Sequence, residues 1–463
     1  MTPARRRILL FAILGVLAAA VLALRFWNQR EQARRTAGVF VPKEIAITPE
    51  MLLLQEYVRI DTSNPPGKEL PGAQWLAAQL RKRGIEAEII ESVPGRANVY
   101  ARIPGKQRGE GLLLLNHIDV VPAVPSQWGQ APFGGRIHRN LMLGRGTLDM
   151  KSIAVCELLA MADVARAGRP PEHDVVFLAV ADEEQGSRFG MQWLLEHRAD
   201  VVDGVRYVIN EGGATEVLAE RLHYVGVEVG SKLLVVATLQ AREREQLQRA
   251  RIALEPYFDS DEPDRVLPAV RHYLADVAPQ RLENRELLAD AEHTVAIGKF
   301  WLLPRSIREL MQNVVWPTGI ERAADGFTMK AFLFNLPDED GAVRVEWLRR
   351  TVAPFGVTVA GFDGTLGPVP FSSPDTPLFG IIRRQMQRVY GPVAVGTHVL
   401  PSSMTDCRFL RKRGIDCYGI YPFPVDVLQT RGVHGTNEMI RLDWFGQGVA
   451  AMGGMVREYA FGG

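Results

Sequence analysis

Short apolar runs alternate with longer amphipathic segments along much of this chain, and the two patterns predict different elements. The segments 49–60, 72–84 and 153–168 read as helices, whereas 111–119 and 174–184 begin as near-continuous apolar runs of strand length. Runs that are apolar on both faces are typical of strands buried in a parallel or mixed sheet. The alternation therefore predicts an α/β layer fold with a mixed or parallel central sheet between helices.

The character of the sequence changes between residues 228 and 352. The apolar segments 231–241 and 327–337 look like strands, and they flank charged helical stretches such as 242–256. A chain of 463 residues is also longer than one core usually supports. We expect an inserted α+β domain here. The predicted organisation is an N-terminal segment 1–45, a first part of the main domain 46–227, the inserted domain 228–352 and a second part 353–463.

An apolar run, residues 8–24, lies directly behind Arg5, Arg6 and Arg7. As a helix it would rise about 25 Å, at the short end of what spans a bilayer. A cleaved signal peptide, an uncleaved anchor and a buried helix are the three interpretations. The bulky residues and Trp27 at the end of the run favour the anchor.

The expected arrangement is therefore a single-pass membrane protein whose main domain lies on the non-cytoplasmic side, the periplasm in a bacterium. The arginines before the run favour this orientation, because positive charge stays on the cytoplasmic side. Four arginines beyond the run oppose it: Arg25, Arg30, Arg34 and Arg35.

Charge and cysteine content narrow the possibilities further. The 54 basic and 53 acidic residues nearly cancel, so no general electrostatic attraction to nucleic acid is expected. Three cysteines, Cys156, Cys407 and Cys417, are too few for a disulfide framework. Cys407 and Cys417 would be able to pair in an oxidising compartment, but we expect two free buried thiols.

Acidic and imidazole side chains follow the apolar runs where the predicted strands end. In open α/β sheets, ligands bind outside the carboxyl ends of the strands, so side chains at several of these ends should converge. One more acid lies in a glycine-rich turn and one more imidazole in a glycine-flanked loop. These residues are His117 and Asp119, Asp149, Asp182, Glu183 and Glu184, Glu211, and His434.

A strand that leaves the core for solvent ends in polar residues without any functional reason. This explanation is sufficient for any one of these strand ends taken alone. Several together, rich in His, Asp and Glu and poor in Lys and Arg, would repel one another without a cation. Imidazole and carboxylate without thiolate form a ligand set for zinc, manganese or cobalt. The pattern therefore favours a metal site over a metal-free structural domain.

Five motifs in a fixed order resemble the di-zinc exopeptidase family of carboxypeptidase S, aminoacylase, acetylornithine deacetylase and succinyl-diaminopimelate desuccinylase. A sixth segment, YVRIDTSNPPGKE at 57–69, is nearest to the carboxypeptidase S branch. The resemblance spans roughly 48–227 and 353–460 and implies a zinc-exopeptidase-like catalytic domain with an inserted lid domain. The five motifs are NHIDVVPA (116–123), GRGTLDMKS (144–152), ADEEQGS (181–187), NEGG (210–213) and HGTNE (434–438).

The resemblance implies two divalent metal ions per chain, zinc in this family, and five ligands that match its motifs. Asp149 would bridge both ions. His117 and Glu211 would complete the first metal position, and Glu184 and His434 the second.

The resemblance also implies roles for residues that bind no metal. Asp119 would orient the His117 ring, and Glu183 would be the general base. The peptide bond between Asp149 and Met150 would be cis. The implied reaction is hydrolysis of the amide bond of a small peptide or N-acyl amino acid by a metal-activated water.

The inserted domain departs from the family pattern. The family's Gly-His-Ser segment is absent, because 236–250 is charged and contains no histidine, and Phe334 stands where the family has an arginine. Asn313 resembles the lid asparagine, and Arg408 is a candidate clamp for a substrate carboxylate. His398 is interpreted as part of loop structure.

Two functional hypotheses follow. The first is an active metallohydrolase with altered specificity, whose active site works within one chain. The second is a membrane-tethered metal-binding protein of the same fold with weak or no hydrolase activity. Because all five ligands and Glu183 are present, the sequence favours the enzyme. It leaves the substrate and the oligomeric state open.

Overall fold

The computed structural model describes residues 43–462 except 219, 255–263, 281–283 and 431. The predicted membrane anchor, residues 8–24, and nearly all of the tether lie outside the described residues. Within the described ranges, no helix combines the length and the apolar character needed to cross a membrane.

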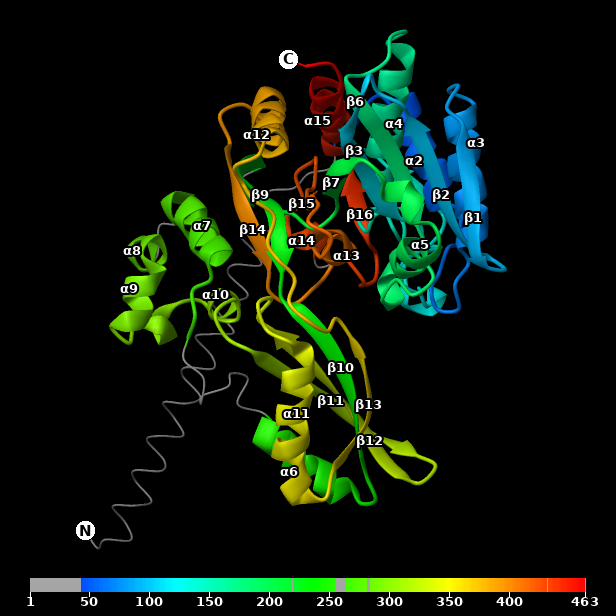
Figure 1. Ribbon diagram of the computed structural model, residues 1–463. Helices are drawn as coiled ribbons and strands as arrows, with labels where there is room; N and C mark the ends of the chain where they lie inside the picture. Colours follow the sequence, from blue (N-terminus) through cyan, green and yellow to red (C-terminus); the bar gives the residue numbers. More distant parts are fainter. Residues whose placement is uncertain (1–42, 219, 255–263, 281–283, 431, 463) are drawn as a thin grey trace, which may run out of the picture.

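Nine strands form a mixed central sheet, which confirms the predicted α/β class (Figure 1). The strand order is β1-β2-β6-β3-β7-β15-β9-β14, with β8 paired to β9. The central neighbours β6, β3, β7 and β15 run parallel, whereas β1 and β2 are antiparallel to their neighbours. The bounds are β1 (Ala87–Val93), β2 (Arg96–Ile103), β3 (Gln107–His117), β6 (His173–Val180), β7 (Val205–Asn210), β8 (Ala214–Leu218), β9 (Arg221–Ser231), β14 (Ala394–Leu400) and β15 (Asp416–Gly419).

The four leucines of β3 explain why this strand is central. Successive side chains of a strand point to opposite faces. Leu112 and Leu114 belong to one hydrophobic cluster, and Leu113 and Leu115 to another. All four are fully buried, so β3 contributes to the core on both faces of the sheet.

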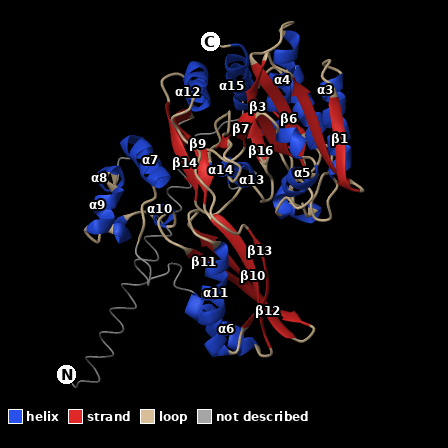
Figure 2. Cartoon of the chain, viewed as in Figure 1, coloured by secondary structure: helices blue, strands red, loops and turns tan. Residues whose placement is uncertain are grey.

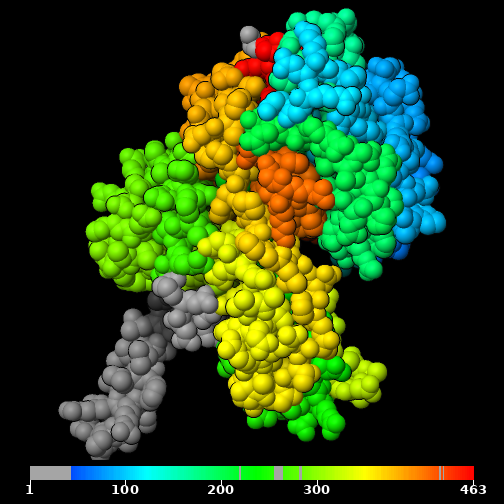
Figure 3. All heavy atoms as spheres, in the orientation of Figure 1, coloured from blue at the N-terminus to red at the C-terminus, as the bar shows by residue number. Residues whose placement is uncertain are grey.

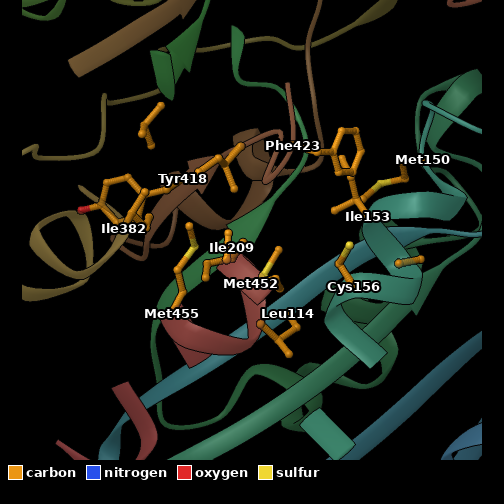
Figure 4. Packing of buried hydrophobic residues seen from close by; sticks show 14 of the residues in the cluster. Leu114, Met150, Ile153, Cys156, Ile209, Ile382, Tyr418, Phe423, Met452 and Met455 are labelled. Atoms are coloured by element: carbon orange, nitrogen blue, oxygen red, sulfur yellow. The ribbon is translucent and has the colours of Figure 1, made fainter. Parts of the chain in front are cut away.

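Helices cover both faces of this sheet (Figure 2). On one face α4 and α15 pack together, and Figure 4 shows side chains of both helices near Leu114 and Ile209 of the sheet. On the other face α5 and α13 contribute to the second cluster. The bounds are α2 (Pro49–Val58), α3 (Glu69–Arg81), α4 (Lys151–Arg166), α5 (Met191–His197), α12 (Pro377–Tyr390), α13 (Cys407–Arg411), α14 (Val427–Thr430) and α15 (Leu442–Phe461).

The inserted lid is a four-stranded antiparallel sheet, in the order β11-β12-β10-β13, with two helices packed on it. It has its own hydrophobic cluster, separate from those of the central sheet. In the space-filling view, the orange residues near 410 lie between the first part of the main domain and the yellow lid (Figure 3). The bounds are β10 (Leu233–Ala241), α6 (Arg244–Leu254), β11 (Val314–Ala323), β12 (Gly326–Asn335), α11 (Gly341–Val352) and β13 (Thr358–Gly364).

The structure divides the chain differently from the predicted boundaries 228 and 352. The lid sheet extends to β13, which pairs with β10 and ends at Gly364. The helix α7 (Pro268–Val277) packs on β14, and α8 (Arg285–Ala289) and α9 (Ala291–Ala296) lie beside α7, away from α6 and α11 (Figure 1); α10 (Arg305–Arg308) follows them in the chain. The apolar face of α7 packs into the core of the main domain, which is why these helices belong to that domain.

A small sheet joins two segments that are distant in the sequence. Its order is β16-β5-β4, with bounds β4 (Arg136–His138), β5 (Leu141–Leu143) and β16 (Met439–Arg441). The strand β5 leads into the turn that carries Asp149, and β16 follows the loop that carries His434. The pairing of β5 with β16 therefore brings these two candidate ligands to one place.

The expectation of two free thiols at Cys407 and Cys417 was wrong. The two cysteines form a disulfide, with their Cα atoms 5.6 Å apart, and Cys156 is free and buried. The physical reason is that α13 and β15 are adjacent, so the ten-residue separation closes into a tight loop. Sequence spacing alone does not show this proximity.

Candidate metal centre and active site

The strand β3 ends by presenting the His117 imidazole. The ring is buried, and its Nδ1–H donates to the backbone oxygen of Asp119 over 2.8 Å. This contact reserves Nδ1, so Nε2 is the nitrogen available to a metal ion, and it is directed at two carboxylates. Nε2 lies 3.0 Å from Asp149 Oδ1 and 3.4 Å from Glu211 Oε1.

The Asp119 carboxylate does a different task from the predicted one. Its Oδ1 lies 3.7 Å from His117 Nδ1, too far for a hydrogen bond, so the backbone carbonyl orients the ring instead. The carboxylate accepts hydrogen bonds from the backbone N–H groups of Glu183 (3.1 Å) and Glu184 (3.2 Å). It also accepts one from Asn64 Nδ2 at 2.9 Å. Asp119 therefore positions the predicted base and a predicted ligand.

The Asp149 carboxylate lies between two imidazoles. Its Oδ1 faces His117, and its Oδ2 lies 2.8 Å from His434 Nε2. The Asp149–Met150 peptide bond is cis, as the resemblance implies. One oxygen facing each histidine is the arrangement that a bridging ligand requires.

The other acids complete two groups of converging donor atoms. Glu184 Oε2 lies 3.0 Å from His434 Nε2. The potential ligand atoms of His117, Asp149 and Glu184 lie within 4.8 Å of one another, and those of His117, Glu183 and Glu211 do so as well. Within the described residues, Glu184 Oε1 is buried without a hydrogen-bond partner. An acceptor in that state is suited to a cation.

Burial and mutual repulsion raise the pKa values of the three glutamates, whereas the hydrogen bonds of His117 and His434 outweigh burial and lower the pKa of Asp149. Desolvation raises the pKa of Glu183 well above its usual value, and the charges of Glu211 and Asp406 add to the effect. Burial likewise raises the pKa of Glu211 to about 7, partly opposed by His117.

The neighbouring carboxylates make the two imidazoles bind protons more tightly. Hydrogen bonds to Asp149 and Glu184 raise the pKa of His434 to about 11. The pKa of His117 is also raised, because the charges of Glu211 and Asp149 outweigh its burial. Without a metal ion, bound protons therefore offset the negative charge of the cluster. Its imidazole and carboxylate donors fit a dinuclear site for zinc-like ions.

A network that the sequence did not reveal holds the turn at Asp182. Asp182 has a left-handed backbone (φ 69°), which is uncommon for a residue other than glycine. Its carboxylate accepts hydrogen bonds from Arg96 (2.7 Å) and Asn64 (2.9 Å), and Arg96 also pairs with the buried Glu69. Asn64 and Glu69 lie in the YVRIDTSNPPGKE segment, which was the available signal.

Arg408 lies beside the predicted base. Its Nη1 is 3.9 Å from Glu183 Oε1 and donates to the Thr405 backbone oxygen over 2.8 Å. The guanidinium packs on the Phe409 ring and is buried. The structure thus brings Arg408 next to the candidate metal cluster.

Asn313 and Phe334, the two lid residues named in the sequence analysis, are both buried. Asn313 directly precedes β11, and Phe334 lies in β12. Asn313 donates to Glu339 Oε2 (3.0 Å) and accepts from the Leu336 N–H (2.8 Å). Phe334 is 4% exposed and packs edge-on against Trp316. Phe334 therefore stabilises the lid sheet in this structure and offers little surface to a substrate.

His398 belongs to strand β14 and not to a loop. Burial lowers its pKa to about 4, and its ring packs edge-on against Tyr273. A neutral, half-buried imidazole held by an aromatic contact is a packing residue.

The pKa shifts predict that metal binding releases protons. His434, with a pKa of about 11, carries a proton at neutral pH in the metal-free protein, and Glu211, with a pKa of about 7, is half protonated there. Ligands must lose these protons, and the raised pKa of His117 adds to the effect, so zinc affinity should rise with pH by at least about one log unit per unit, more steeply just below pH 7. Calorimetry in buffers of different ionisation enthalpy measures the protons released. Zinc binding at pH 6.5 without proton release would contradict the assignment of these ligands.

Comparison with known sequences identifies the family. The sequence profile described as peptidase family M20/M25/M40 matches residues 113–458. Aminoacylase-1 of Sus scrofa is 28% identical over 178 residues, which cover 38% of this chain and 44% of that protein. Succinyl-diaminopimelate desuccinylase of Methylocella silvestris is 40% identical over 131 residues, 27% of this chain and 33% of that protein. The matched region thus spans less than half the length of these relatives.

Solved structures share the fold over more of the chain. The M20 family metallo-carboxypeptidase Sso-CP2 of Sulfolobus solfataricus has a TM-score of 0.70 at 19% identity, covering 89% of this chain and all of that one. The di-peptidase Dug1p of Saccharomyces cerevisiae has a TM-score of 0.65 at 17% identity, covering 89% and 95%. With the profile match over most of its length, the chain belongs to peptidase family M20/M25/M40.

Proposed function

We propose that this protein is a metallohydrolase that cleaves the amide bond of a peptide or N-acyl amino acid, with two zinc ions per chain. The observation that carries the proposal is the Asp149 carboxylate, which has one oxygen beside His117 and the other beside His434. Family membership supports the class of reaction. The names of the relatives, an aminoacylase and a desuccinylase, support an acylated amino acid as one kind of substrate.

The five ligand residues divide between the two metal positions through Asp149. His117 and Glu211 would complete one position, and Glu184 and His434 the other. Ions held there would lower the pKa of a water molecule and polarise the substrate carbonyl.

Glu183 is the residue placed to move the proton. Its carboxylate lies with the His117 and Glu211 donors, and its backbone is fixed by Asp119. It accepts a proton from the attacking water and delivers it to the leaving nitrogen, while the water oxygen bonds to the carbonyl carbon and the C–N bond breaks. The products are a carboxylate and an amine. The raised pKa of Glu183, caused by burial and by Glu211, suits a group that must take up and release a proton.

Arg408 is the proposed partner of a substrate carboxylate. Its Nη1 lies 3.9 Å from Glu183 Oε1, and its charge is held in a buried setting where an anion would be strongly attracted. Asn313 is a weaker candidate, because Glu339 and Leu336 already occupy both ends of its amide.

The lid supports a site that works within one chain. The nine histidines of the sequence include none in 233–254 or 314–364, the segments that form the lid. The lid therefore has no imidazole to place in the active site of a second subunit. Donors to the developing oxyanion must come from the metal ions and from the chain that binds the substrate.

The alternative hypothesis, a metal-binding protein with weak or no activity, has the altered lid in its favour. Against it stands the placement of Glu183, which Asp119 holds beside the candidate ligands through its backbone N–H. Together with its raised pKa, this placement favours a catalytic role.

Membrane attachment through residues 8–24, with the enzyme on the non-cytoplasmic side, is also proposed. The uninterrupted apolar run behind three arginines supports attachment. The Cys407–Cys417 disulfide independently supports an oxidising compartment, because disulfides rarely persist in the cytosol.

The substitution Glu183→Gln should keep both ions and lose about 10²–10⁴-fold in turnover, because the side chain loses its ability to carry the proton. Glu184→Gln is the matched control: the same change one residue later should weaken metal binding. Turnover of N-acyl amino acids and dipeptides, together with zinc content, measures both effects. Near wild-type turnover of Glu183→Gln would remove the base assignment.

Turnover per chain should be independent of protein concentration, because no second subunit completes the site. The measurement is the initial rate on an identified substrate over a dilution series, with sedimentation at each concentration. A rate per chain that falls as an oligomer dissociates would show that subunits share the site.

Cell fractionation should find the full-length chain in the membrane, and a chain without residues 1–42 in the soluble fraction. Denatured without reductant, the membrane form should expose one thiol per chain, that of Cys156, and three after reduction. A soluble full-length chain, or a mature N-terminus near residue 25, would contradict the anchor.

A further inference from the structure

One buried carboxylate outside the ligand set joins the two loops that carry Asp149 and His434. Glu438 is fully buried, and its Oε2 pairs with Arg145 Nη1 at 2.6 Å. The same oxygen accepts the Gly146 N–H at 2.9 Å.

The second oxygen of Glu438 holds the end of the turn. Its Oε1 accepts the backbone N–H of Leu148 at 2.7 Å and that of Asp149 at 3.3 Å. The turn from Arg145 to Asp149 therefore wraps around one carboxylate. Its last contact is with the backbone of the predicted bridging ligand itself.

Further contacts fasten the loop that carries His434 to the same turn. Arg145 Nη2 donates to the Gly435 backbone oxygen at 2.7 Å, and Gly144 N–H donates to the Glu438 backbone oxygen at 2.9 Å. His434 itself has a left-handed backbone (φ 56°), a conformation that the surroundings must maintain. The Arg145–Glu438 pair supplies that support, because Arg145 holds Gly435, the residue that follows His434.

We propose that Glu438 is a positioning residue that sets the distance between Asp149 and His434, and so controls occupancy of the second metal position. This inference rests on the proposed dinuclear site. It differs from a general structural role because it predicts a selective effect. The position formed by His434, Glu184 and Asp149 should weaken, and the position formed by His117 and Glu211 should stay nearly intact.

The substitution Glu438→Gln tests this with little change of shape. The amide keeps one acceptor oxygen and places an NH₂ group against the donors of the turn, so the turn loses part of its hold. Zinc is titrated into the metal-free full chain in competition with a chromophoric chelator. The wild-type protein should bind zinc in two classes, one of which is lost in His434→Ala. In Glu438→Gln the affinity of that class should fall about 10–100-fold, and the affinity of the other class by less than about threefold.

Asp174→Asn is the matched control for loss of a buried ion pair. Asp174 is also buried, pairs with Arg102 and accepts a backbone N–H, that of Gly105. It lies at the start of β6, whereas the candidate ligands follow the ends of the strands. Asp174→Asn should lower thermal stability and leave both zinc classes unchanged.

Three results would overturn the proposal: unchanged zinc affinities in Glu438→Gln, equal weakening of both classes, or the same pattern in Asp174→Asn. Should Glu438→Gln fail to fold, Arg145→Gln leaves the carboxylate and its backbone donors in place. It removes the tie to Gly435, and the same zinc class should weaken by a smaller factor. Unchanged affinities in that variant would likewise reject the role of the pair.

Turnover gives a second readout that a purely structural role would not move. Raising free zinc above the weakened dissociation constant should restore much of the activity of Glu438→Gln, but none of that of Glu183→Gln. Because the zinc titration needs no substrate, an enzyme inactive on every amide tested would reject the proposed function without deciding the role of Glu438.

Discussion

The repulsion between acids that converge at one edge of the central sheet is the constraint on which the rest of the structure depends. Asp149 and Glu184 converge with His117, Glu183 and Glu211 do so as well, and His434 lies beside Asp149 and Glu184. Two like charges about 4–5 Å apart cost on the order of 3–4 kcal/mol in a partly polar interior. Arg408, 3.9 Å from Glu183, and the two imidazoles offset only part of this cost, so a bound cation is the natural compensation.

The surroundings of the cluster hold these acids without neutralising them. Asp119 uses its carboxylate to fix two backbone N–H groups, and Glu438 does the same for the turn at Asp149. The arginines that balance these supporting acids face away from the ligands: Arg96 pairs with Glu69 and Asp182, and Arg145 with Glu438. Arg96 and Arg145 are therefore paired with the supporting acids, and the ligand carboxylates stay available for ions.

The sequence predicted those features that depend on chemical type and strand pattern. The leucines of β3 identified a strand buried on both faces, and the acids behind the strands identified the cluster, because few other roles suit so many carboxylates. It did not predict features that depend on which chain segments meet in space. The disulfide, the packing of α7 on the main domain and the use of the Asp119 carboxylate all require distances between segments. Asp119 contacts the His117 ring through its backbone oxygen and not its carboxylate, because the strand ends at His117 and the alternation of faces no longer applies two residues later.

The division of the main domain by the lid gives metal binding a second consequence. The first part of the domain supplies His117, Asp149, Glu184 and Glu211, whereas the second part supplies His434 from a loop whose histidine side chain is 54% exposed. Only ions bridged by Asp149 would connect the two parts through strong coordinate bonds. An ion that binds the folded protein alone, at 100 times its dissociation constant, adds about 2.7 kcal/mol to the free energy of unfolding. The pairing of β5 with β16 and the Arg145–Glu438 contact place His434 before the ion arrives, so less of the binding free energy is spent on ordering the loop. The same contacts that place His434 thus join the two halves of the domain at the site.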